Sequence, residues 1–151
     1  MSSFVPSGPA VANETVANDG WYPDLTTKDM QAETGQDDVP GTDRIAGAIR
    51  AAMIETNIVL TSWRAGQTAA SLSDVVARKY GDTSEKVLLY RTAVYARARS
   101  ELISVTRDYD STKDGHDRAD ALEKTADDWL RQSNEALSRL MGRPRAVVEL
   151  I

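Results

Sequence analysis

The sequence contains no cysteine, so the chain forms no disulfide and offers no thiolate to a metal or to redox chemistry. Its single histidine, His116, stands between Gly115 and Asp117, and no residue beside it suggests a catalytic partner. The sequence also lacks a Gly-rich phosphate loop, a nucleophile elbow and any zinc-ligand spacing. Because catalysis needs groups placed to attack or to transfer protons, we expect no enzyme, no cofactor and no metal site.

Long hydrophobic runs are missing as well. No stretch approaches the ~20 consecutive apolar residues that span a bilayer, and the N-terminus lacks a basic region followed by an apolar run. We therefore expect neither an export signal nor contact with a membrane. The formal net charge is -5, and a surface of that sign repels phosphate backbones, which disfavours tight binding to duplex DNA.

Aromatic residues are scarce, and Ala, Leu and Val make up most of the apolar residues. Small and unbranched side chains lose little conformational freedom in a helix, so the composition favours helices over a sheet. The length of 151 residues suits one domain. The sequence predicts an all-α fold, a small bundle of three long helices with one short connecting helix. We expect an extended N-terminal arm over 1–41, a helical domain over 42–142 and a C-terminal tail over 143–151.

The first long helix is predicted to begin at Thr42, to continue past Trp63 and to stop at Gly66. Its inward-facing residues recur at helical spacing: Ile45, Ile49, Ala52, Met53, Thr56, Leu60 and Trp63. The short connecting helix is predicted from Ser71 to Tyr80, because Ser71-Leu72-Ser73-Asp74 resembles a capping box.

The central helix is predicted to begin at Glu85, after the start signal Asp82-Thr83-Ser84. Its apolar stripe is broad enough to contact other helices on more than one side: Val87, Tyr90, Val94, Ala98, Leu102 and Val105, widened by Leu88, Leu89, Tyr95 and Ile103. Three arginines, Arg91, Arg97 and Arg99, are expected on its exposed flank. A charged loop is predicted over 107–115.

The last helix is predicted from about His116 to Met141, and Gly142 marks its end. One face carries Ala119, Leu122, Ala126, Trp129, Ser133, Leu137 and Leu140. Trp63 and Trp129 fall on the buried stripes of their helices, so core packing is a better interpretation of both than ligand binding.

Each end of the chain contains a candidate docking element. In the arm, Trp21-Tyr22-Pro23 combines two aromatic rings with a residue that favours extended backbone, and it either packs on its own domain or docks on a neighbouring subunit. The tail either folds back on its own helices or adds a strand to a partner's open sheet edge. Its candidate contact residues are Arg143, Pro144, Arg145, Val147, Val148, Leu150 and Ile151.

Several short elements, taken in order, resemble the head completion or head stabilisation family (gpL) of contractile-tailed temperate phages. They are Trp21-Tyr22-Pro23-Asp24, Met53-Ile54-Glu55-Thr56-Asn57, Leu89-Tyr90-Arg91-Thr92-Ala93-Val94, Arg118-Ala119-Asp120, Asp128-Trp129-Leu130-Arg131 and Met141-Gly142-Arg143-Pro144-Arg145. The resemblance extends over most of the chain, and its strength lies in the order and spacing of the elements.

The resemblance implies a largely helical adaptor that binds beneath the portal protein after DNA packaging, retains the genome and offers a platform for the tail. It implies a ring of identical copies, dodecameric in step with the portal. The tail-side partner would be a neck or tail terminator protein. Packaged DNA would pass through the channel without sequence-specific binding, and the protein would be assembled in the host cytoplasm into the neck of the virion.

Two details of this interpretation concern arginine residues. Arg143 and Arg145 would form forked hydrogen bonds with carboxylates of the portal. A different class of function, a small helical DNA-binding or DNA-packaging accessory protein, would instead use Arg91, Arg97 and Arg99 on a duplex, although the net charge disfavours it.

Overall fold

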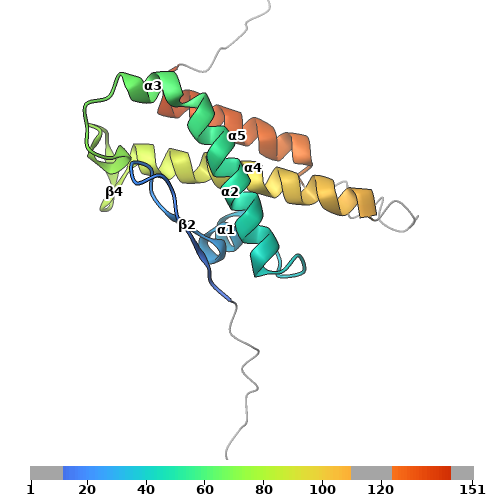
Figure 1. Cartoon of the computed structure of the whole chain (residues 1–151). Coiled ribbons are helices and arrows are strands. Elements are labelled where there is room, and N and C mark those ends of the chain that lie inside the picture. The colour runs from blue at the N-terminus through green and yellow to red at the C-terminus, as the bar shows by residue number, and fades with distance from the viewer. Residues whose placement is uncertain (1–11, 110–123, 144–151) are drawn as a thin grey trace, which may run out of the picture.

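The computed structural model describes residues 12–109 and 124–143, without the side chains of residues 108 and 109. Three helices form most of this body: α2 (Thr42–Val59), α4 (Glu85–Tyr109) and α5 (Ala126–Leu140). Helices α4 and α5 run antiparallel, side by side, and α2 crosses α4 obliquely (Figure 1). Helix α4 is thus the central element, as predicted, because it packs against both other long helices.

The predicted all-α fold is wrong, although the described chain is mostly helical. Strand β1 (Thr15–Val16) pairs antiparallel with β2 (Leu25–Thr26), and β3 (Lys79–Tyr80) pairs antiparallel with β4 (Thr83–Ser84). Each strand is two residues long, too short to show the alternation by which strands are recognised in a sequence.

The predicted N-terminal arm is also wrong for the residues that the structure describes. Val16, Tyr22, Leu25 and Met30 are buried in the same core as α2 and α4. Between them and α2 lies a further helix, α1 (Thr27–Thr34), which begins where the Thr26 hydroxyl accepts a hydrogen bond from the Asp29 amide. Isolated apolar residues in a polar segment therefore fill the core, and residues 1–11 lie outside the described part.

The first predicted helix is divided in two. Helix α2 ends at Val59, and after Leu60 a short helix, α3 (Thr61–Ala65), carries Trp63 in a half-buried position. The other predicted inward residues, Ile45, Ile49, Ala52, Met53, Thr56 and Leu60, are all buried. The apolar period was thus recognised correctly, but the break at Leu60 gave no signal in the sequence.

The predicted connecting helix over Ser71–Tyr80 is wrong. Only a 3-10 turn, η1 (Leu72–Asp74), is helical; it is followed by a bend at Val75 and Val76 and then by strand β3 from Lys79. Gly81 has φ 64° at the first central position of the β3–β4 turn, as type II′ hairpins require. This glycine allows the two-residue turn between Tyr80 and Thr83, and so it explains why a hairpin forms here instead of a helix.

The interface between α4 and α5 is the most extensive between two helices of the described part, and it includes small and polar side chains. Ala93 and Ala136 are buried there, and the buried Ser133 hydroxyl donates a hydrogen bond to the Ala93 carbonyl at 2.7 Å. Helix α4 continues to Tyr109, so the first residues of the loop predicted over 107–115 are helical. Helix α5 begins with a capping box of Thr125 and Asp128, and its predicted earlier start, near His116, lies outside the described residues.

Trp129 is not the core residue that its spacing predicts. The side chain is half-buried, and the Lys124 ammonium lies 4.5 Å from the centre of its ring. Leu137 and Leu140, predicted on the same face of the helix, are buried, because they lie farther along α5 against α4.

This difference predicts unequal costs of truncation. Ile49→Ala should lower the free energy of unfolding by about 2–5 kcal/mol, because Ile49 is fully buried. Trp129→Ala should lower it by only about 1–2 kcal/mol, because part of the ring surface is already in water. Urea denaturation of both variants checks this, and equal losses would contradict the placement of Trp129.

Candidate functional site

The loop that carries Trp21 and Tyr22 is held by its own polar side chains. One Asp19 carboxylate oxygen accepts hydrogen bonds from the amides of Trp21 at 3.0 Å and Tyr22 at 3.1 Å. The Asp24 carboxylate accepts one from the Asn18 amide at 2.8 Å. Aspartate side chains that bond to nearby amides stabilise turns, so this loop has a defined backbone.

Asn18, Asn57 and Tyr90 form a closed ring of hydrogen bonds between the loop, α2 and α4. The Asn18 side-chain amide donates to the Tyr90 hydroxyl at 2.8 Å, and this hydroxyl donates to the Asn57 side-chain oxygen at 2.7 Å. The Asn57 amide completes the ring by donating to Asn18 at 3.0 Å. Burial raises the pKa of Tyr90 well above its usual value, so its hydroxyl keeps the proton that it donates.

Aromatic side chains pack directly against these three hydrogen-bonded residues. Tyr22 stacks on Tyr90 with ring centres 4.8 Å apart, and the edge of Trp21 meets Tyr22 at the same separation. Trp21 also lies 6.1 Å from Trp63 of α3 and donates a hydrogen bond to the Ala69 carbonyl at 3.0 Å. We call Trp21, Tyr22, Trp63, Arg64 and Tyr90 the aromatic cluster.

The aromatic cluster includes one cation, Arg64, whose guanidinium lies 4.9 Å from the centre of the Trp21 ring. The same guanidinium pairs with Asp19 at 2.6 Å. Burial alone would raise the pKa of Asp19, but the Tyr22 and Trp21 amides and Arg64 together lower it below its usual value. Burial likewise raises the pKa of Tyr22, to about 12, against the opposing charge of Arg64.

Helix α5 ends beside the aromatic cluster. The Lys86 ammonium, in the first turn of α4, donates to the Leu140 carbonyl at 2.5 Å and lies 5.8 Å from the Trp63 ring centre. Gly142 has φ 73°. Its backbone amide donates a hydrogen bond to the Arg139 carbonyl, and the Arg143 amide donates one to the Ser138 carbonyl at 2.9 Å. This is a Schellman motif, and it sets the direction in which the chain leaves α5.

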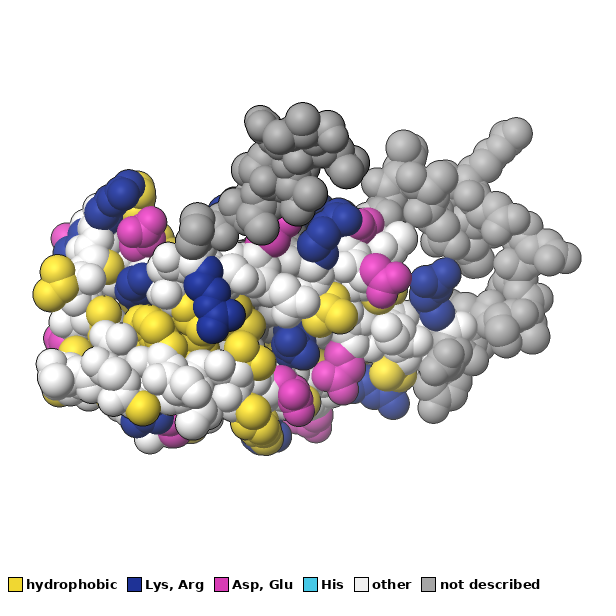
Figure 2. Space-filling view, turned by 90° about the horizontal axis from the view of Figure 1, so that it is seen from above, with side chains coloured by type: hydrophobic (Ala, Val, Ile, Leu, Met, Phe, Trp, Pro, Cys, Tyr) yellow, Lys and Arg dark blue, Asp and Glu magenta, His cyan; other side chains and the backbone are white. Residues whose placement is uncertain are grey.

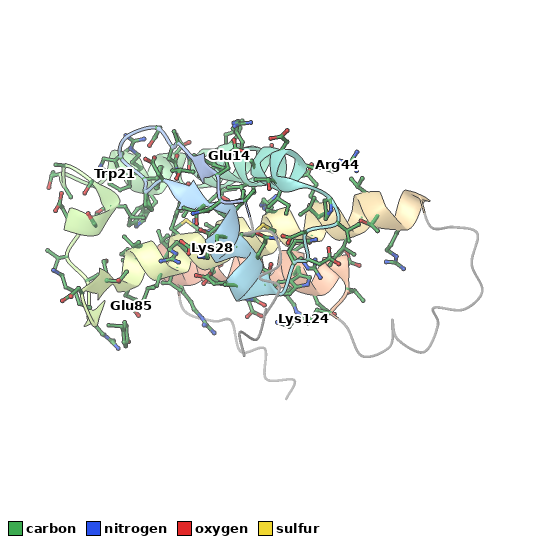
Figure 3. All side chains as sticks on the ribbon, turned by 90° about the horizontal axis from the view of Figure 1, so that it is seen from below. Glu14, Trp21, Lys28, Arg44, Glu85 and Lys124 are labelled. Atoms are coloured by element: carbon green, nitrogen blue, oxygen red, sulfur yellow. The ribbon has the colours of Figure 1, made fainter. Side chains whose placement is uncertain are left out.

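Figure 3 shows Trp21 and Glu85, the first residue of α4, at one end of the molecule, and Arg44 and Lys124 toward the other. Apolar side chains gather on the face seen in Figure 2, over the end of the molecule where α3 and the start of α4 lie, with Lys and Arg side chains beside them. Two elements predicted from the sequence, Trp21-Tyr22-Pro23 and Arg143, therefore belong to the same end of the fold.

The structure places the predicted contact residues unevenly. Tyr22 is 3% exposed, Trp21 and Pro23 are half-buried, and Arg143 is exposed. Of the two interpretations of the aromatic pair, packing on its own domain is the one the structure shows, and contact with a neighbour stays a prediction. The remaining predicted contacts lie outside the described residues: Pro144, Arg145, Val147, Val148, Leu150 and Ile151.

The residues that fix this site were not singled out from the sequence. Asn18 and Asp19 are part of an Asn-Asp-Gly turn signal directly before the aromatic pair, which the prediction could have used. Asn57 and Arg64 carry no such signal, because their partners are distant in the sequence: Asn57 meets Tyr90, and Arg64 meets Asp19.

The predicted exposed flank of α4 is wrong, because Arg91, Arg97 and Arg99 are half-buried. Arg91 pairs with Glu33 of α1 at 2.9 Å, and Arg99 donates a hydrogen bond to Gln36. Arg97 donates to Asn134 of α5 at 3.5 Å. These guanidinium groups hold neighbouring segments of the chain, which leaves them poorly placed to meet a DNA duplex.

Two further properties concern only the described residues. No helix among them is long and apolar enough to cross a membrane. Within the same ranges, no group of three or more His, Asp or Glu side chains is placed to hold a metal ion.

Several large apolar side chains in the described part face solvent: Val39, Ile54, Ile58, Val59, Val76, Tyr80 and Val105. Ile54 and Ile58 lie one turn apart on α2, and neighbouring exposed apolar side chains of this kind suit a structural protein that acts through contacts with other proteins.

The comparisons with known proteins agree with this class. The family model described as phage head completion protein (GPL) matches residues 16–151. The chain is 31% identical over 146 residues to the head completion/stabilization protein of Escherichia phage P2, and the alignment covers 95% of this chain and 86% of that protein. The chain therefore belongs to the phage head completion protein family, as its sequence motifs predicted, and is a structural protein of the virion. No solved structure matches it.

The hydrogen-bonded ring predicts that Tyr90→Phe destabilises the fold. Removal of the hydroxyl leaves the Asn57 oxygen without its donor, which should cost about 1–3 kcal/mol in the free energy of unfolding. Tyr80→Phe is the matched control, because Tyr80 is 56% exposed on the hairpin. Urea denaturation compares the two variants, and a Tyr90→Phe loss as small as that of the control would show that the ring contributes nothing.

The lowered pKa of Asp19 predicts a stability difference that depends on pH. An aspartate whose folded-state pKa lies below the unfolded value of about 3.9 stabilises the fold above that pH and ceases to do so as the pH falls through the folded value. Asp19→Asn should therefore lower the melting temperature at pH 6 and have little effect at pH 2. Asp82→Asn, at the exposed hairpin turn, is the control. A constant Asp19→Asn effect across this range would contradict the prediction.

Proposed function

We propose that this head completion protein is an adaptor at the neck of a tailed phage. In this proposal it binds beneath the portal after DNA is packaged, stabilises the filled head and forms the platform to which the tail attaches. Family membership supports a role in head completion, and the observation that carries the finer proposal is the way α5 ends. A Schellman motif, supported by Lys86, holds Arg143 exposed at the point where the tail leaves the body.

The sequence that follows this point supports portal docking. Arg143-Pro144-Arg145 offers two guanidinium groups, which bind carboxylates through paired hydrogen bonds. Val147-Val148 and Leu150-Ile151 are β-prone apolar pairs that an open sheet edge of a partner would bury. The tail is thus the proposed portal contact, and the aromatic cluster is the rigid base from which it extends.

The proposed assembly is a ring of identical copies, dodecameric in step with the portal, with a neck or tail terminator protein on its tail side. A rigid helical body suits a ring subunit, because the radius of a ring is set by fixed distances between its contact surfaces. Assembly takes place in the host cytoplasm, and the completed ring lies at the head-tail neck.

Packaged DNA passes through this ring without sequence-specific binding in the proposal. A formal net charge of -5 supports free passage, because phosphate backbones are repelled. The alternative of a DNA-binding or DNA-packaging accessory protein loses its main support, since Arg91 and Arg99 contact Glu33 and Gln36 of the same chain.

Deletion of residues 146–151 should leave the helices folded and abolish co-sedimentation with portal rings. The expected reason is that the tail adds binding surface but lies beyond the end of α5 at Leu140. Circular dichroism checks the fold and sedimentation checks binding, with Val39→Ser as a surface control far along the chain from the tail. Co-sedimentation of the shortened chain at the level of the full chain would show that the tail is not the portal contact.

A further inference from the structure

A shallow groove lies over α4, between α2 and α5. Its lining comes from all three helices: Ala51, Ala52, Ile54 and Glu55 of α2, Arg97, Ser100 and Glu101 of α4, and Leu130 of α5. Ile54 is 55% exposed, and Ile58, which lies one turn farther along α2 and just outside the groove lining, is 61% exposed. The groove therefore combines an apolar wall on α2 with two exposed carboxylates, Glu55 and Glu101.

The β3–β4 hairpin is a second apolar feature, and it projects from the body beside the start of α4 (Figure 1). Val76, just before β3, is 98% exposed and Tyr80 is 56% exposed. Arg78 and Lys79, which stand between them, are exposed as well. Val76 lies in the bend that leads into the hairpin and Tyr80 lies on β3, and large apolar side chains this exposed and this close together suit a surface that contacts a partner.

The hairpin and the groove are complementary in chemistry. The hairpin offers two large apolar side chains with two cations between them, and the groove offers apolar side chains with two carboxylates. Arg97 is also in the groove, but its guanidinium is directed to Asn134 of α5. The Asp82 carboxylate lies in the turn of the hairpin, after Tyr80. It therefore does not stand between the cations of Arg78 and Lys79 and the two apolar side chains.

A hairpin cannot enter the groove of its own chain. Glu85 follows the hairpin directly and Arg97 lies in the groove, so the two surfaces are separated along one rigid helix by about 18 Å at 1.5 Å per residue. A contact between them must therefore join two copies. Such a contact is head-to-tail, because it uses different surfaces on the two partners, and repeated head-to-tail contacts generate a ring when the rotation between copies closes.

We propose that the β3–β4 hairpin of one copy docks in the groove between α2 and α5 of the next copy. Val76 and Tyr80 pack against Ile54, Ile58 and Leu130, while Arg78 and Lys79 pair with Glu55 and Glu101. This contact rests on the proposed function, since it is the subunit interface of the proposed ring. It specifies which surfaces meet, which the proposed function leaves open.

The absence of cysteine from the chain permits a direct test by cross-linking. Phage particles are assembled with the double variant V76C/I54C, purified and treated with a short bis-maleimide, whose span tolerates geometry that a disulfide would not. The expected result is a ladder of covalent multimers, because every copy then carries both halves of the contact. The single variants V76C and I54C should remain monomeric on the same gel.

The matched control is V39C/I54C. Val39 is 88% exposed, like Val76, but it precedes α2 and belongs to neither surface, so this pair should give no ladder. A monomeric V76C/I54C chain in particles that contain it in normal amount overturns the docking proposal and leaves the proposed function intact. Absence of the wild-type chain from purified necks would instead contradict the proposed function.

A charge exchange distinguishes loss of the proposed contact from a failure to assemble for other reasons. R78E/K79E should reduce incorporation of the chain into particles at least tenfold, because each introduced carboxylate would face a carboxylate of the groove, Glu55 or Glu101. Adding E55K/E101K to the same chain should restore incorporation. Loss without rescue by the exchanged pair would also overturn the proposed contact.

Discussion

The hydroxyl group of Tyr90 joins segments that are far apart in the sequence. It accepts a hydrogen bond from Asn18, donates one to Asn57 of α2, and belongs to a ring on which Tyr22 stacks. The two amide side chains and the phenol also satisfy one another, so their burial carries little desolvation cost. The orientation of α2 on α4 and the position of the N-terminal segment depend on this one group of contacts, and with them the place of Trp21 beside the end of α5.

The sequence predicted the long helices well, because each helix is governed by local spacing. Ile45, Ile49 and Ala52 on α2, and Tyr90, Val94 and Ala98 on α4, are buried as their period indicates. Prediction failed where contacts between residues distant in the sequence determine the structure. The segment with Val16 and Leu25 has too few apolar residues for a period, yet each fills a space that α2 and α4 leave open. Trp129 has the right period but lies near the start of α5, where its ring remains partly exposed.

The candidate site was foreseen only in part, for the same reason. The aromatic pair and the basic end of α5 can be found in the sequence, but their proximity follows from Lys86 and the antiparallel packing of α4 and α5. The arginines of α4 show the reverse error. Arg91 and Arg99 fall on the polar side of the helix by period, and only the folded chain brings Glu33 and Gln36 to them.

The hydrogen bond from Lys86 to the Leu140 carbonyl also affects how the protein would respond to a pulling force. A pull on the C-terminal segment would enter the body at Arg143 and act along the axis of α5. Lys86 connects the last turn of that helix to the first turn of α4, next to the β3–β4 hairpin. Tension would thus reach two helices at once instead of unravelling one helix from its end.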